Sequence, residues 1–183
     1  MVCVHGLTRN SRDFDSLATV LAGRGGTVFV QGMAGRGRSG WHSSPHEYAI
    51  ETFLINVQGC LALPGRQRIG WIGTSMGRLM GMALAVVRPE AVRSPVLNDI
   101  GLFFWRRLLH RLPFVGEDPV FTDVRAVETH LCRVYVGFGA LSEWKWQHLA
   151  RHSIRHDQNA QLRLYDDPAI GQEFKSIEGV IDL

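Results

Sequence analysis

The stretch that most constrains this chain is an apolar run that leads into Gly73-Thr74-Ser75-Met76-Gly77 and continues as a helical pattern. Residues 69–72 have the character of a buried strand, and residues 76–87 place apolar side chains on one helical face. The sequence therefore predicts a strand, a sharp turn and a helix, with Ser75 at the bend.

The residue types at this bend suit nucleophilic chemistry. Such a bend forces Ser75 into a strained backbone conformation and exposes its Oγ, while Gly73 and Gly77 let the strand and the helix approach closely. The amide N–H of Met76, at the start of the helix, would point toward negative charge that develops on an attacked carbonyl oxygen. The pentapeptide also occurs by chance, so a glycine-rich turn without chemistry is the alternative interpretation.

Composition indicates one globular domain. The chain has 183 residues, of which 45% are hydrophobic and 20% charged, and its formal net charge of +3 is too small to indicate nucleic-acid binding. Its three cysteines are widely spaced, which favours a reducing compartment over a disulfide framework. No apolar run approaches the roughly eighteen residues of a membrane span, and residues 1–4 lack the basic segment and long apolar core that are typical of a signal sequence. We therefore expect a cytoplasmic protein without a membrane partner.

Short apolar runs alternate with helical patterns over the first hundred or so residues. The expected strands are residues 2–4, 27–30, 69–72 and 95–97, and the expected helices are residues 14–21, 50–61 and 76–87. This alternation predicts an α/β fold with a mostly parallel sheet and flanking helices, in which ligands bind at the carboxyl ends of the strands.

The pattern changes beyond Gly101. Only helices are expected there, at residues 103–112, 122–136 and 142–156. We therefore predict a core over residues 1–101, and a helical cap with a C-terminal tail over residues 102–183.

The segment Gly35-Arg36-Gly37-Arg38-Ser39-Gly40 matches the glycine fingerprint of dinucleotide-binding folds letter for letter. That fingerprint needs a strand directly before it and a helix directly after it. Here the predicted strand ends about four residues too early, and Pro45 interrupts the region where the helix should run. We therefore expect no cofactor, and an NAD-type oxidoreductase is the least favoured function.

Three histidines recur every four residues, at His148, His152 and His156. Two histidines at this spacing on a helix can bind zinc. Arg151 and Arg155 interleave with them, and the sequence places no carboxylate or cysteine beside them. A solvated helical face is the favoured interpretation, so no metal is expected.

Two other features have a structural and a functional interpretation. His5 could act as a base, but its position before Gly6 suits a structural role in shaping the turn. The basic amphipathic segment at residues 105–112 could touch a membrane surface, and a cap helix with its polar face in water is favoured instead.

Four motifs, in order, resemble the α/β-hydrolases, specifically bacterial members with an esterase-like core. They are His5-Gly6-Leu7, Gly35-Arg36-Gly37-Arg38-Ser39, Gly73-Thr74-Ser75-Met76-Gly77 and Val96-Leu97-Asn98-Asp99. Weaker similarity continues to residues 167–170, so the resemblance covers nearly the whole chain. It implies that Ser75 is the nucleophile, that the amides of Met76 and Leu7 form the oxyanion hole, and that the reaction passes through a covalent ester.

The resemblance also implies a triad acid and a triad histidine, which lie after the cap in this family. We expect this chain to stop at Leu183 before the strands that carry them, as a truncated or degenerate member. Asp99 occupies a position that some family members use for the acid, and a structural turn residue is the alternative. The absence of the histidine matters because a serine hydroxyl needs a base to remove its proton.

Two hypotheses follow from the sequence. The first is a serine hydrolase that acts on a small carboxylic ester or related acyl substrate through Ser75, without metal or cofactor. The second is a non-catalytic binding protein that keeps the pocket, or one half of an assembly. Without the closing strands an apolar sheet edge would be exposed, so self-association through that edge is expected.

Overall fold

The computed structural model describes residues 1–59, 68–98 and 114–176. The candidate acid Asp99 and the predicted helix at residues 103–112 lie outside the described residues.

A parallel sheet of four strands forms the centre of the molecule. Its strands are β1 (Val2–Val4), β2 (Phe29–Gln31), β3 (Ile69–Thr74) and β4 (Val92–Asn98), in the spatial order β2-β1-β3-β4. Every residue of β1 is buried, as expected for a central parallel strand that is covered on both faces. The prediction of an α/β fold with a mostly parallel sheet is confirmed.

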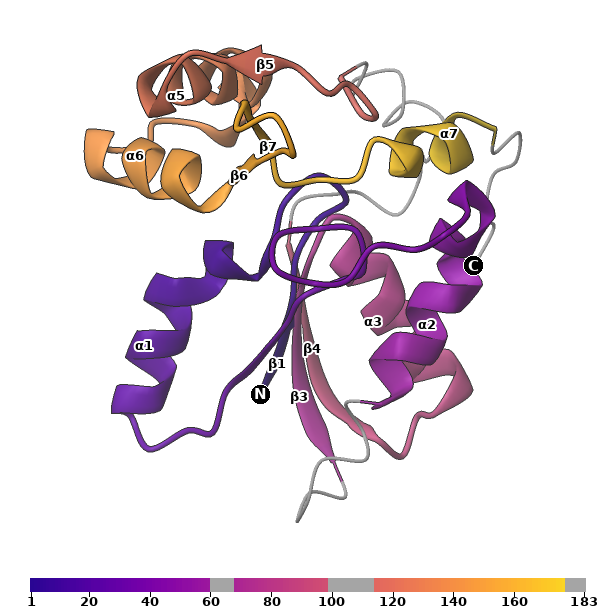
Figure 1. Cartoon of the computed structure of the whole chain (residues 1–183). Helices are drawn as coiled ribbons and strands as arrows, with labels where there is room; N and C mark the ends of the chain where they lie inside the picture. Colours follow the sequence, from indigo (N-terminus) through magenta and orange to yellow (C-terminus); the bar gives the residue numbers. More distant parts are fainter. Residues whose placement is uncertain (60–67, 99–113, 177–183) are drawn as a thin grey trace.

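Helices cover both faces of this sheet (Figure 1). Helix α1 (Asp15–Gly23) lies on one face, and α2 (Ile50–Gln58) and α3 (Met76–Val87) lie on the other. Successive side chains of β1 point to opposite faces of the sheet, so β1 contributes to the apolar packing on both faces. Val2 and Val4 belong to the larger apolar cluster, whereas Cys3 packs with Phe14 and Ile72. In the described part of the chain, no helix combines the length and the apolar character that a membrane crossing needs.

The cap contains a small antiparallel sheet as well as helices. Its helices are α5 (Val124–Val134) and α6 (Glu143–His152), with a short 3-10 turn, η4 (Val136–Phe138), between them. Its strands are β5 (Val120–Phe121), β6 (Ile154–His156) and β7 (Leu162–Leu164), in the order β5-β7-β6. The expectation of helices only beyond Gly101 is therefore wrong, and the predicted helix at residues 142–156 ends at His152.

Side-chain hydrogen bonds stabilise the end of that helix and the turn that follows it. The hydroxyl of Ser153 donates to the carbonyl of Leu149 at 2.7 Å, next to the last helical residue. Asp157 Oδ1 then accepts the amides of Asn159 and Gln161, both at 2.9 Å, and so shapes the turn between β6 and β7. Each of these two short strands contains an arginine, so neither forms the continuous apolar run by which β1 could be recognised in the sequence.

The cap lies over the carboxyl ends of the core strands (Figure 1). It has its own apolar cluster, formed by Val127, Leu131, Tyr135, Leu149, Ala150 and Leu162. After β7 the chain returns to the core, where α7 (Ala169–Ser176) packs beside the 3-10 turn η2 (Pro45–Tyr48). The hydroxyl of Tyr48 donates to Asp167 at 2.5 Å and so holds the segment after β7 against the core.

Candidate active site

Ser75 occupies a strained turn between β3 and α3. Its backbone angles are φ 52° and ψ −115°, a region that residues with a side chain rarely adopt. A Cβ added at Gly77 would collide with the Val4 carbonyl, and one added at Gly73 would collide with the carbonyl of Gly77. The strained serine and the close approach of strand and helix are therefore as predicted.

The turn after β1 lies directly against this serine. A Cβ added at Gly6 would stand 3.4 Å from the Cβ of Ser75 and 4.0 Å from its Oγ. The Leu7 amide hydrogen, on this turn, donates to no acceptor within the described residues. Met76 opens α3, where the first amides have no acceptor inside the helix. Two N–H donors thus lie on segments that border the Ser75 hydroxyl.

His5 fixes the orientation of that turn. Its buried ring donates from Nδ1 to the Gly6 carbonyl at 2.7 Å, and its Nε2 accepts from the Met33 amide at 3.1 Å. Burial lowers the pKa of His5 to about 4, so the ring is neutral at pH 7. The Gly6 carbonyl and the Leu7 N–H belong to one planar peptide and point in opposite directions, so the bond from His5 sets the direction of the Leu7 N–H. With both nitrogens engaged, His5 is a positioning residue and not a base.

Arg36, from the glycine-rich segment, supports the same turn from beneath. Its fully buried guanidinium donates from Nε to the Leu7 carbonyl and from Nη1 to the Ala34 carbonyl, both at 2.8 Å, and lies 4.7 Å from the Phe53 ring centre. Burial lowers the pKa of Arg36 to about 10. Arg36 of this segment therefore lies inside the protein, where its hydrogen bonds hold the backbone of the turn beside Ser75.

A cavity of about 440 Å³ opens above Ser75, between α1 and the cap. A group of apolar side chains forms part of its wall, and it includes Phe14, Leu17, Phe138, Leu141, Trp144 and Leu149. Lys145 and His148 from α6 add polar groups to the wall. A cavity of this size and lining fits a small ligand that is mostly aliphatic.

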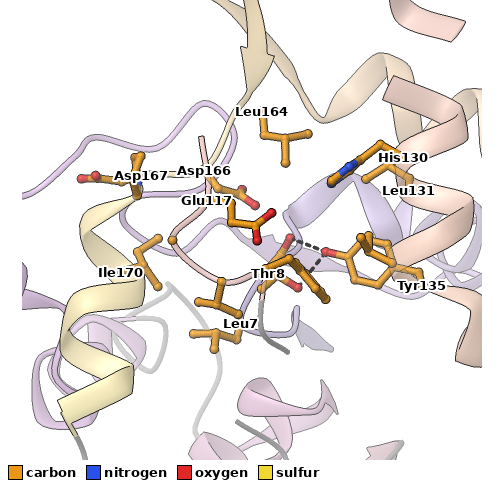
Figure 2. Close-up of a pocket in the computed structure, with 15 residues that line it drawn as sticks. Leu7, Thr8, Glu117, His130, Leu131, Tyr135, Leu164, Asp166, Asp167 and Ile170 are labelled. Atoms are coloured by element: carbon orange, nitrogen blue, oxygen red, sulfur yellow. Dashed lines mark hydrogen bonds between the residues drawn. The ribbon is translucent and has the colours of Figure 1, made fainter. Parts of the chain in front are cut away.

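The described residues place no base beside Ser75. His148 lines the same cavity, but its Nε2 lies 3.1 Å from the Arg12 carbonyl and 3.3 Å from Asp15 Oδ2. His130, on α5, lines a separate cavity (Figure 2). Among the described residues, no hydrogen-bond partner engages the Ser75 hydroxyl.

The cap is attached to the turn that carries Leu7. A second, smaller cavity has a volume of about 30 Å³. In its wall the Tyr135 hydroxyl donates to Thr8 Oγ1 at 2.8 Å (Figure 2). Burial raises the pKa of Asp166, in the same wall, to about 7, against the opposing effect of Arg9 and Arg36. The turn that carries Leu7 and the cap therefore share one polar junction.

Arg9 also links the segment after β1 to the cap. It pairs with Asp13 on its own segment at 2.6 Å and donates from Nη1 to the Ser153 hydroxyl of the cap at 2.8 Å. Burial alone would lower the pKa of Arg9, but Asp13, Tyr135 and Asp166 act together in the opposite direction and raise it.

The structure also supplies a carboxylate that sequence analysis missed. Asp15, at the start of α1, offers an oxygen that lies together with ring nitrogens of His148 and His152, all within 4.8 Å of one another. His156 is on β6 and is not part of this group. This cluster could not be predicted from the sequence, because it depends on the docking of α6 against the start of α1.

The sequence matches a known protein family and a named hydrolase. A family model described as alpha/beta hydrolase fold matches residues 1–148. A protein of Cupriavidus necator named 3-hydroxybutyrate-oligomer hydrolase is 30% identical over 179 residues, which are 96% of this chain and 61% of the relative. The chain thus spans about three fifths of the length of that relative.

Solved structures agree with the family model. The chain is similar to an α/β hydrolase from Novosphingobium aromaticivorans, with a TM-score of 0.85 and 30% identity over 97% of this chain and 63% of the other. An esterase from Mycobacterium tuberculosis shares the fold, with a TM-score of 0.67 and 21% identity over 91% of this chain and 55% of the other.

Proposed function

This chain belongs to the α/β-hydrolase family, and we propose that it is a serine hydrolase that cleaves a small carboxylic ester or related acyl compound through Ser75. The observation that carries the proposal is the position of Ser75. It sits in a strained turn at the wall of a cavity of about 440 Å³, with Gly6 packed against it. The cap closes the other side of that cavity.

The proposed reaction is acyl transfer in two steps. Ser75 Oγ forms a bond to the ester carbonyl carbon, and the amides of Leu7 and Met76 stabilise the negative charge on the carbonyl oxygen. The bond to the alcohol then breaks, the alcohol leaves with the proton that the Ser75 hydroxyl gave up, and the acyl group stays on Ser75. Water hydrolyses this ester, releases the carboxylic acid and restores the serine.

The lining of the cavity supports a class of substrate. Apolar side chains such as Leu141 and Trp144 suit a short aliphatic chain, and Lys145 offers a cation for a carboxylate. The Cupriavidus necator relative is named for oligomers of 3-hydroxybutyrate, which are short aliphatic esters with a terminal carboxylate. We propose short esters of aliphatic hydroxy acids as the substrate class.

Hydrolysis of p-nitrophenyl butyrate tests the reaction. We expect the wild-type chain to release p-nitrophenol and Ser75→Ala to lose this release, because no acyl group can be held at residue 75. Ser94→Ala, at an exposed position on β4, is the matched control and should leave the rate unchanged. Each protein is first checked for cooperative unfolding.

The second candidate is a non-catalytic binding protein, or one half of an assembly that completes the site. The observation that favours it is the lack of a base beside Ser75 within the described residues. Equal rates for wild type and Ser75→Ala, together with a rise in melting temperature on adding 3-hydroxybutyrate, would support binding and overturn the hydrolase proposal.

A further inference from the structure

A cluster of metal-binding side chains lies where α6 of the cap meets α1 of the core. His148 and His152 are four residues apart on α6, so their rings share one face of the helix, with ring centres 4.5 Å apart. Asp15 faces them from the first turn of α1, and its Oδ2 lies 3.3 Å from His148 Nε2.

These distances are close to those of a bound ion. Bonds of about 2.0–2.1 Å in a tetrahedral zinc site place ligand atoms about 3.3 Å apart. The pair of Asp15 and His148 is already at 3.3 Å, and all three ligand atoms lie within 4.8 Å of one another. Small side-chain rotations would bring all three to one ion and leave a position for water. Two imidazoles and one carboxylate suit a transition metal better than Mg²⁺ or Ca²⁺, which prefer oxygen ligands.

The surroundings of the cluster allow an ion to enter. Arg12 Nη2 holds Asp15 Oδ2 at 2.9 Å, but the Arg12 side chain is 50% exposed and can turn toward water when a stronger cation arrives. The side chains of all three cluster residues are partly exposed.

We propose that Asp15, His148 and His152 form a binding site for a divalent transition-metal ion such as Zn²⁺, which fastens the cap to the core. The ion would bridge α1 and α6 beside the Ser75 cavity, because His148 also lines that cavity. Its occupancy would stabilise the closed arrangement of cap and core. This site is independent of Ser75 chemistry and stands whether or not the chain is a hydrolase.

Isothermal titration calorimetry with ZnCl₂ tests the site on the full chain. We expect one ion per chain, and a dissociation constant at least about tenfold weaker in His152→Ala and in Asp15→Asn, each of which lacks one ligand. MgCl₂ should give no such binding. Zinc in a hundredfold excess over its dissociation constant should raise the melting temperature of the wild type by about 5 °C, and that of the variants by less.

His156→Ala is the matched control, because this histidine is outside the cluster and should leave zinc affinity unchanged. Asp15→Asn is nearly isosteric, so it still reports on the site if His152→Ala fails to fold. The proposal is overturned if the wild type binds no zinc, or if a folded variant binds zinc as tightly as the wild type. Equal loss of affinity in His156→Ala would also contradict it.

Discussion

Two polar residues near Ser75 hold the backbone of the neighbouring turn in place. His5 and Arg36 are fully buried polar side chains, and each bonds to a carbonyl of the turn that carries Leu7. The role of His5 in shaping this turn could be predicted from its position before Gly6, but the buried role of Arg36 could not. An arginine in a glycine-rich loop has no local signature that distinguishes burial from exposure.

The neutral state of His5 makes stability depend on pH. Its pKa is about 4 in the folded chain and about 6.5 when unfolded. Above pH 6.5 both states are neutral, so full stability is present there. Between about pH 6.5 and 4 only the unfolded chain takes up the proton, and the free energy of unfolding should fall by about 1.4 kcal/mol per pH unit.

Urea unfolding of His5→Gln at a series of pH values measures this contribution. The variant should show a shallower loss of stability between pH 6.5 and 4 than the wild type, by about that amount per unit. His156→Gln, at an exposed position, should keep the wild-type slope. Parallel curves for wild type and His5→Gln would contradict the assignment of a buried neutral ring.

Among the elements, β3 and α3 illustrate what the sequence can specify. The helix runs from Met76 to Val87 as predicted, because its apolar spacing and the glycines at the turn are local features. The strands β6 and β7 of the cap were missed because, unlike β1, neither forms an apolar run, and only their antiparallel pairing identifies them. The cluster of Asp15 and two histidines was missed for the same reason, since only tertiary packing creates it.

The contact between β1 and α3 leads to a prediction at Gly77. Alanine is favoured over glycine inside a helix by about 1 kcal/mol, but here its Cβ would collide with the Val4 carbonyl. We expect Gly77→Ala to lower the free energy of unfolding by about 2 kcal/mol or more. Thermal and urea unfolding both measure this change.

Gly23→Ala is the matched control, because Gly23 ends α1 and a Cβ there would meet nothing within 4 Å. It should be neutral or slightly stabilising. Similar losses of stability in both variants would show that Gly77 is not needed for the close packing of α3 against β1.

At the scale of the whole molecule, two features matter, which are the attachment of the cap to the core and the edge of the central sheet. The cap is joined to the core through Thr8, Arg9 and Asp15, which lie on one short segment after β1. The central sheet ends at β4, which is an edge strand within the described residues. The fold class could be predicted from alternating local patterns, whereas the attachment of the cap depends on contacts between distant segments.

The edge at β4 supports the proposal of self-association. Val96 is 53% exposed on this strand, and an unpaired strand edge is a template for pairing with another chain. We expect sedimentation velocity to show oligomers that increase with protein concentration, and Val96→Lys to shift the chain toward monomer. Val20→Lys, at an equally exposed position of 53% on α1, should not do so. A wild-type chain that stays monomeric at all concentrations would refute the proposal.

Covalent labelling of Ser75 tests the central proposal most directly. A fluorophosphonate reacts with activated serines, and intact-mass spectrometry after labelling counts the adducts on each chain. The account predicts one adduct on the wild type, placed on Ser75 by peptide mapping, and none on a folded Ser75→Ala variant. No adduct on the wild type, or equal labelling of both proteins, would show that Ser75 is not a nucleophile in this chain.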